Sequence, residues 1–240
     1  MVNRKNIWVT GCGRSGTGLL VILMGYFKHY NTNTTSEKAP EHIKKKIKNN
    51  NIIIKKPLYG KFLTEEPYFK ILDSIFSKNF KIVYIMRDPR DVLTSHHYSK
   101  PNIYWESYPN PRCTSLARWT RGAKIAEAYK ENPNFHIVKY EDIVTNPLME
   151  LDKIAFFANT TYDKNKVLEF YNDPTHKQNT QIPIYRALNG LREISDSNIG
   201  RWKLSEHSKR IKDIYNDSEL MEWANKVGYN MRELEKDKND

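Results

Sequence analysis

The chain has 240 residues, a length that fits one domain with a full-sized core. Hydrophobic residues make up 39% of it and charged residues 28%, which argues against wholesale disorder. The net charge of +11 favours polyanionic or phosphorylated partners without separating nucleic acid from nucleotides. Two cysteines, Cys12 and Cys113, are too few for a disulfide-stapled secreted domain, and the apolar run 19–24 is too short to span a bilayer. With no start of signal-peptide type, we expect a cytoplasmic protein.

Short apolar runs alternate with helix-like stretches along the chain. Strands are expected at 7–10, 51–55, 81–86 and 135–139. Helices are expected at 16–29, 67–77, 89–98, 114–130 and 147–158. This alternation predicts an α/β domain over residues 1–232 with a central parallel sheet flanked by helices, followed by a charged tail at 233–240 that frays.

Three polar stretches are expected to be loops, namely 31–50, 100–112 and 173–198. In a sheet of this type, ligands bind beyond the carboxyl ends of the strands, where such loops converge. We therefore expect these stretches to shape the substrate pocket.

The first predicted strand runs into a glycine-rich turn, Trp8-Val-Thr-Gly-Cys-Gly-Arg-Ser-Gly-Thr-Gly18. Backbone amides at such a turn and the positive end of the helix dipole can hold a phosphate. The spacing Gly11-x-x-x-x-Gly16 is close to the ATP-binding loop, but Thr17 stands where that motif has a lysine. The cation of the turn is Arg14. A kinase or ATPase is therefore disfavoured, and a plain strand-to-helix connection is the simplest alternative.

A second basic position follows the strand at 81–86. This strand delivers Arg87 at its carboxyl end, and Ser95 is expected about two turns along the next helix. A guanidinium and a hydroxyl can bind one phosphate group together. An ATPase usually has a metal-binding aspartate at this strand end, whereas Asp88 and Asp91 are interpreted as helix-start acids. Taken alone, Arg87 with Asp88 is more often a structural ion pair.

The two segments together resemble the sulfotransferases that use 3′-phosphoadenosine 5′-phosphosulfate (PAPS). That family carries an Arg/Lys-Ser-Gly-Thr loop for the 5′-phosphosulfate, and a strand-end Arg with a Ser eight residues later for the 3′-phosphate. Both patterns are present in the family's order, as Arg14-Ser15-Gly16-Thr17 followed by Gly18, and as Arg87 with Ser95.

Three further segments are similar to the same family. Tyr140-Glu-Asp resembles the segment whose tyrosine lies near the adenine. Gly-Arg201-Trp-Lys203 resembles the late loop that closes over the nucleotide, and Ile-Ile-Ile-Lys55 resembles the strand whose lysine approaches the leaving phosphate. The resemblance implies a P-loop NTPase-like sulfotransferase fold, with local motifs closest to the protein-tyrosine and bacterial-type branch.

The resemblance also implies a reaction, the in-line transfer of a sulfuryl group from PAPS to an acceptor hydroxyl. Charge builds on the bridging oxygen of the leaving nucleotide, and Arg14, Lys55 and the loop amides are expected to neutralise it without a metal. Lys56 is the rival of Lys55, and strand alternation favours Lys55. His96 and His97 suggest a metal site, but the sequence offers no third ligand at a sensible spacing.

The acceptor hydroxyl needs a catalytic base. In the cytosolic small-molecule branch a histidine follows the strand-end lysine by two positions, whereas this chain has Pro57 there. The protein-tyrosine branch places a glutamate soon after the first helix, and Glu37 is the nearest match. Glu41, His42 and His96 are competing candidates for the base.

Two other classes of function are weaker. A P-loop nucleotide or metabolite kinase predicts a lysine in place of Thr17 and an aspartate at the strand end. A basic nucleic-acid-binding protein is suggested by the net charge and the lysine-rich run 44–48, but the chain has no recognised nucleic-acid fold signature. We expect PAPS and a hydroxyl-bearing acceptor as partners, with the acceptor (carbohydrate, peptide tyrosine or small alcohol) and the oligomeric state left open.

Overall fold

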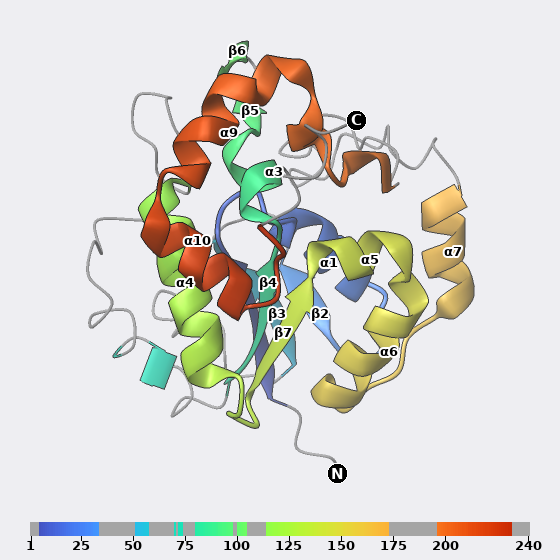
Figure 1. The fold of residues 1–240 in the computed structure, drawn as a ribbon. Helices are drawn as coiled ribbons and strands as arrows, with labels where there is room; N and C mark the ends of the chain where they lie inside the picture. The colour runs from blue at the N-terminus through green and yellow to red at the C-terminus, as the bar shows by residue number, and fades with distance from the viewer. Residues whose placement is uncertain are drawn as a thin grey trace.

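A five-stranded parallel sheet forms the centre of the computed structural model (Figure 1). The structure describes residues 5–33, 51–57, 70, 72–73, 80–97, 100–104, 114–172 and 196–231. The strands, in spatial order, are β2 (Asn31–Asn33), β3 (Ile52–Lys55), β1 (Asn6–Gly11), β4 (Phe80–Met86) and β7 (Phe135–Lys139). The predicted parallel α/β architecture is confirmed.

The order of the strands places two loops next to each other. From β1 the chain goes to β2 at the edge of the sheet, returns through β3 to the side of β1, and then crosses to β4 and β7 on the other side. Ligands of doubly wound sheets bind at this kind of reversal, beyond the carboxyl ends of the central strands. Gly11 at the end of β1 is in register with Ile85 of β4, so the turn after β1 and Arg87 after β4 emerge side by side.

Helices cover both faces of the sheet (Figure 1). One face is covered by α1 (Thr17–Met24), α5 (Tyr140–Thr145), α6 (Pro147–Ala158) and α7 (Lys164–Asn172). The other face is covered by α3 (Pro89–Leu93), α4 (Leu116–Tyr129), α9 (Ser208–Tyr215) and α10 (Ser218–Lys226). Because both faces are covered, the central strands are near-continuous apolar runs, which is why the sequence revealed them. No helix in the described part of the chain is long and apolar enough to cross a membrane.

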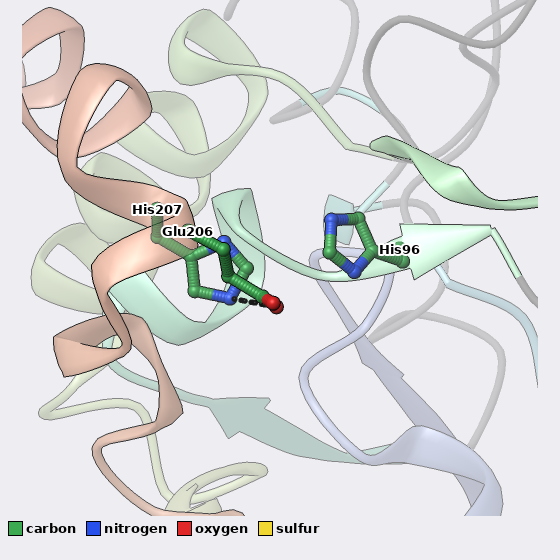
Figure 2. A group of neighbouring side chains, drawn as sticks. All are labelled: His96, Glu206 and His207. Carbon is green, nitrogen blue, oxygen red and sulfur yellow. Dashed lines mark ion pairs between the residues drawn. The ribbon is translucent and has the colours of Figure 1, made fainter.

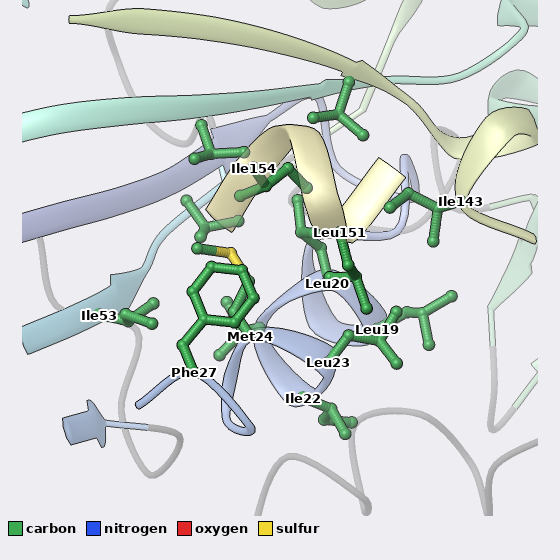
Figure 3. Packing of buried hydrophobic residues seen from close by; sticks show 14 of the residues in the cluster. Leu19, Leu20, Ile22, Leu23, Met24, Phe27, Ile53, Ile143, Leu151 and Ile154 are labelled. Atoms are coloured by element: carbon green, nitrogen blue, oxygen red, sulfur yellow. The ribbon is translucent and has the colours of Figure 1, made fainter. Parts of the chain in front are cut away.

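Helix α1 is the most deeply buried helix-forming segment of the first face. All eight of its residues are buried, and it packs among Ile53, Leu151 and Ile154 (Figure 3). A helix that is apolar on every side must be enclosed by protein, which is what α5, α6 and the sheet provide. The prediction extended this helix to residue 29, but it ends before Gly25, a poor helix former.

The predicted helix at 89–98 is also too long. It ends at Leu93, after which β5 (His96–His97) pairs antiparallel with β6 (Lys100–Tyr104), where a loop was predicted. The hydroxyl of Thr94 donates to the carbonyl of Arg90 and that of Ser95 to the carbonyl of Asp91, and such bonds compete with helix continuation. Ser95 therefore follows the short helix instead of lying two turns along it.

The boundaries of two other predicted helices are closer to those in the structure. The helices predicted at 114–130 and 147–158 are confirmed within two residues. Strand β2 was missed because its sequence, Asn-Thr-Asn, has no apolar signal. Most of the helix predicted at 67–77, most of the three predicted loops and the tail at 233–240 lie outside the described residues.

We expect Leu20→Ala to lower the free energy of unfolding by about 2–5 kcal/mol, because Leu20 is fully buried between α1 and the sheet and its loss leaves a cavity. The control Phe156→Ala removes a larger side chain that is 88% exposed, and it should change stability by less than about 0.5 kcal/mol. Urea denaturation followed by circular dichroism measures both. Equal losses in the two variants would contradict this description of the core.

Candidate active site

The turn between β1 and α1 needs glycine at two positions. Gly11 has φ +150°, and a Cβ on it would lie 2.2 Å from the carbonyl oxygen of Ile85. Gly16 has φ +96°, and a Cβ on it would lie 2.6 Å from Cδ2 of Tyr140. Both backbone angles favour glycine, and both contacts leave no room for a side chain. The turn is thus pressed between β4 and the ring of Tyr140.

The start of α1 presents backbone amides that the helix itself does not use. Among the described residues no side chain caps the helix, its first turn has no acidic residue, and its first backbone bond runs from Leu20 to Gly16. The amides of Thr17, Gly18 and Leu19 therefore have no acceptor within the helix. The hydroxyl of Ser15 is buried and has no hydrogen-bond partner among the described residues. Buried polar groups normally pair, so these donors fit a bound oxyanion.

Arg87 joins this turn to several distant segments. Its Nη1 donates to the carbonyl of Arg14 at 3.3 Å, and its Nη2 donates to the carbonyl of Asn198 at 2.6 Å. The guanidinium carbon lies 4.3 Å from the ring centroid of Tyr140, and Nη2 lies 3.8 Å from Oδ2 of Asp91. Only 12% of the side chain is exposed. The guanidinium is therefore fixed beside the glycine-rich turn.

Asp91 holds the late loop against α3. Its two carboxylate oxygens accept hydrogen bonds from the amides of Gly200, at 2.8 Å, and Trp202, at 3.1 Å. Burial raises the pKa of Asp91, while the neighbouring Arg87 and the two amides oppose that shift. The interpretation of Asp91 as a helix-start acid is confirmed, but no local pattern predicted its bonds to a turn more than 100 residues away.

Tyr140 and Glu141 connect the same region to β7. Tyr140 begins α5 directly after that strand, and burial raises the pKa of its hydroxyl, so the group stays protonated. The carboxylate of Glu141 accepts a hydrogen bond from the amide of Asp88 at 2.9 Å. Asp88 in turn caps α3 and forms an ion pair with Arg90, with 2.7 Å between Oδ2 and Nη2. These contacts support the backbone on either side of Arg87.

The two predicted strand-end lysines differ in burial. Lys55 ends β3, is 8% exposed and is in register with Val9 of β1. It lies on the same face of the sheet as Ile53, the face that α1 covers, whereas Lys56 follows the end of the strand and is half-buried. Burial beside the strand that leads into the glycine-rich turn favours Lys55 over Lys56.

The remaining predicted positions are less tightly grouped. Ser95 is half-buried directly after α3, and its hydroxyl donates to the carbonyl of Asp91 at 3.1 Å. Arg201 and Lys203 are exposed on η5 (Arg201–Lys203), on either side of the buried Trp202. The proposed base Glu37 and two of its rivals, Glu41 and His42, lie outside the described residues.

Solved structures show the same fold at low sequence identity. Mouse sulfotransferase SULT7A1, determined in complex with PAP, has a TM-score of 0.64 and 17% identity, with 94% of this chain and 88% of that chain covered. The sulfotransferase domain from the curacin biosynthetic pathway has a TM-score of 0.59 and 15% identity, with 96% and 99% covered. These likenesses confirm the fold.

Sequence relatives point in the same direction. Sulfotransferase 2A1 of Mus musculus is 25% identical over 148 residues, which are 54% of this chain and 52% of that protein. Sulfotransferase 2A1 of Homo sapiens is 27% identical over 104 residues, 39% of this chain and 36% of that protein. The chain thus spans about half the length, or less, of these curated relatives. The family model of the sulfotransferase domain matches residues 4–205, well over half of the chain. This chain belongs to the sulfotransferase domain family.

Proposed function

We propose that this protein is an enzyme that transfers a sulfuryl group from PAPS to the hydroxyl of an acceptor. The observation that carries the proposal is the position of Arg87, whose buried guanidinium is fixed against a turn that presents uncapped amides. Two anion-binding elements side by side are what a nucleotide with phosphates on both its 5′ and 3′ positions requires. Family membership supports the same donor.

In this proposal, the turn after β1 holds the 5′ end of the donor. Its contributors are Arg14, the buried hydroxyl of Ser15 and the amides that lead into Gly18. The Ser15 hydroxyl, which has no partner among the described residues, is the observation that favours a fit, because a buried hydroxyl normally completes its hydrogen bonding with a ligand or water. Bound PAPS would supply the sulfuryl group and a leaving group that becomes more negative as the bond breaks.

The other end of the donor is assigned to the residues around α3. Arg87 and Ser95 would bind the 3′-phosphate, and Tyr140 would lie beside the adenine while its ring also positions Arg87. Arg201 and Lys203 would reach the phosphates from η5, the turn that Asp91 holds. Their exposure in the structure leaves both side chains able to move toward a ligand.

Charge stabilisation is the main work of the chain's own residues. Arg14, Lys55 and the amides at the start of α1 carry the positive potential that a departing phosphate oxygen needs. We propose that these groups suffice without a metal. Glu37 is proposed as the base that accepts the proton of the acceptor hydroxyl; it lies outside the described residues, and its assignment depends on the resemblance alone.

Arg87→Ala should weaken binding of 3′,5′-adenosine bisphosphate by about 10- to 100-fold, because it removes charged hydrogen bonds to the 3′-phosphate. Calorimetric titration without magnesium measures the affinity, and circular dichroism checks that the variant is folded. Lys166→Ala, which removes one charge from the exposed side of α7, is the control and should bind like the wild type. Binding only of ATP with magnesium would contradict the proposal and support a kinase.

Lys55→Ala should lower kcat for PAPS-dependent sulfation of a simple phenol such as 2-naphthol by about 10²- to 10³-fold, because it removes a cation that acts on the leaving group. Its affinity for 3′,5′-adenosine bisphosphate should change little. Lys56→Ala is the matched control, since it removes the same charge one residue later, directly after the end of β3. A large loss of kcat in Lys56→Ala with normal turnover in Lys55→Ala would reverse the assignment. If 2-naphthol is not an acceptor, the same comparison applies to a tyrosine peptide or a sugar alcohol.

A further inference from the structure

Three potential metal ligands meet away from the glycine-rich turn. His96 comes from β5, and Glu206 and His207 come from η6 (Ser205–His207), the turn that begins α9 (Figure 2). One ligand atom of each side chain lies within 4.8 Å of the others. The sequence offered His96 and His97 without a third ligand, because the other two residues are about 110 positions later. The fold brings to His96 two further ligands that its neighbours in the sequence do not provide.

His207 has the surroundings of a metal-binding histidine. It is 3% exposed, and its Nε2 lies 3.4 Å from a carboxylate oxygen of Glu206. Ligands that bind one zinc ion at 2.0–2.2 Å in a tetrahedron are separated by roughly this distance. The other ring nitrogen, Nδ1, lies 3.1 Å from the hydroxyl of Tyr104. Histidine ligands usually have their outer nitrogen hydrogen-bonded in this way, which fixes the ring.

The same tyrosine orients the second imidazole. The ring of His96 stacks on Tyr104, with 4.7 Å between centroids and 16° between planes, and lies 5.2 Å from the ring of His207. Tyr104 thus positions both histidines from β6. The Glu206 side chain is 59% exposed, so the cluster has one open side through which an ion can enter and a water ligand can remain.

We propose that His96, Glu206 and His207 bind one divalent transition-metal ion of the Zn²⁺ class. Two imidazoles and one carboxylate suit zinc, cobalt and nickel, whereas Mg²⁺ and Ca²⁺ take oxygen ligands. Arg201 and Arg210 add positive charge to the surroundings, so the carboxylate of Glu206 is needed to balance the ion. The proposal does not depend on the proposed sulfuryl transfer.

The position of the cluster gives the ion a structural role. His96 directly follows Ser95, and Glu206 follows Lys203 by three residues. A bound ion would therefore fasten the end of α3 to the segment that contains η5, in addition to the bonds that Asp91 makes with that segment. A metal here joins two parts of the chain and needs no contact with the reacting groups.

The test uses Co²⁺ as a coloured substitute for Zn²⁺, added to the full chain without nucleotide. We expect one Co²⁺ per chain with the visible absorption of a low-coordinate site, displaced by Zn²⁺. Glu206→Gln should weaken the affinity at least about tenfold, and His96→Ala should weaken it about 100-fold or more. Glu206 is exposed, so its substitution keeps the test valid if a variant of the buried His207 fails to fold.

His29→Ala is the matched control, since His29 is an exposed histidine on the turn after α1. It should bind Co²⁺ like the wild type. Zn²⁺ should also raise the melting temperature of the wild type and of His29→Ala, but not that of His96→Ala, because only the former bind the ion in the folded state. Absence of Co²⁺ absorption, or equal binding by wild type and His96→Ala, would overturn the proposal. Either result would leave the binding of 3′,5′-adenosine bisphosphate unaffected.

Discussion

The buried guanidinium of Arg87 is the interaction on which the arrangement of the candidate site depends. It contacts the carbonyl of Arg14 in the turn after β1, the carbonyl of Asn198 before η5, and the ring of Tyr140 at the start of α5. A long cationic side chain held on so many sides loses its conformational freedom when the protein folds, before any ligand arrives. That preorganisation lowers the entropic cost of binding an anion.

This cation is balanced by acids placed behind it. The carboxylate of Asp91 accepts a hydrogen bond from the amide of Gly200, and its Oδ2 lies 3.8 Å from Nη2 of Arg87. The carboxylate of Glu141 accepts a hydrogen bond from the amide of Asp88. Both carboxyl groups are removed from water, and this burial raises the pKa of Asp91 and of Glu141. Removing one member of such a buried network destabilises the protein, because the remaining charge is then buried without an opposite charge beside it. The stability of this region therefore depends on the same few charges that form the candidate site.

The sequence predicted the parts of the fold that have strong local signals. The strands at 51–55 and 81–86 were recognisable because a central strand of a covered parallel sheet is apolar on both sides. The glycine-rich turn was recognisable because only glycine tolerates the contacts at Gly11 and Gly16. Strand β2 was not recognisable from the sequence, because its residues are polar. It lies at the edge of the sheet and forms hydrogen bonds with β3.

Interactions between distant segments were beyond sequence reasoning. Ser95 was predicted two turns along the helix after Arg87, but that helix ends early, where the hydroxyls of Thr94 and Ser95 bond to backbone carbonyls and the β5–β6 pair follows. The hold of Asp91 on Gly200 and the meeting of His96 with His207 join segments more than 100 residues apart. No local pattern encodes such contacts, because they depend on how the strands are ordered in the sheet and on where the later segments pack.

The same strand order has a consequence for the time course of folding. The bonds of Arg87 to Arg14 and to Asn198 join residues 73 and 111 positions apart, and the first of them spans the neighbouring strands β1 and β4. Contacts of such long range are slow to form, because the chain loses much loop entropy before they stabilise it. The turn after β1 and α1 depend largely on local contacts, whereas the partners of Arg87 come from segments far apart in the chain. A nucleotide analogue that needs Arg87 would thus recognise the completed chain and not its intermediates.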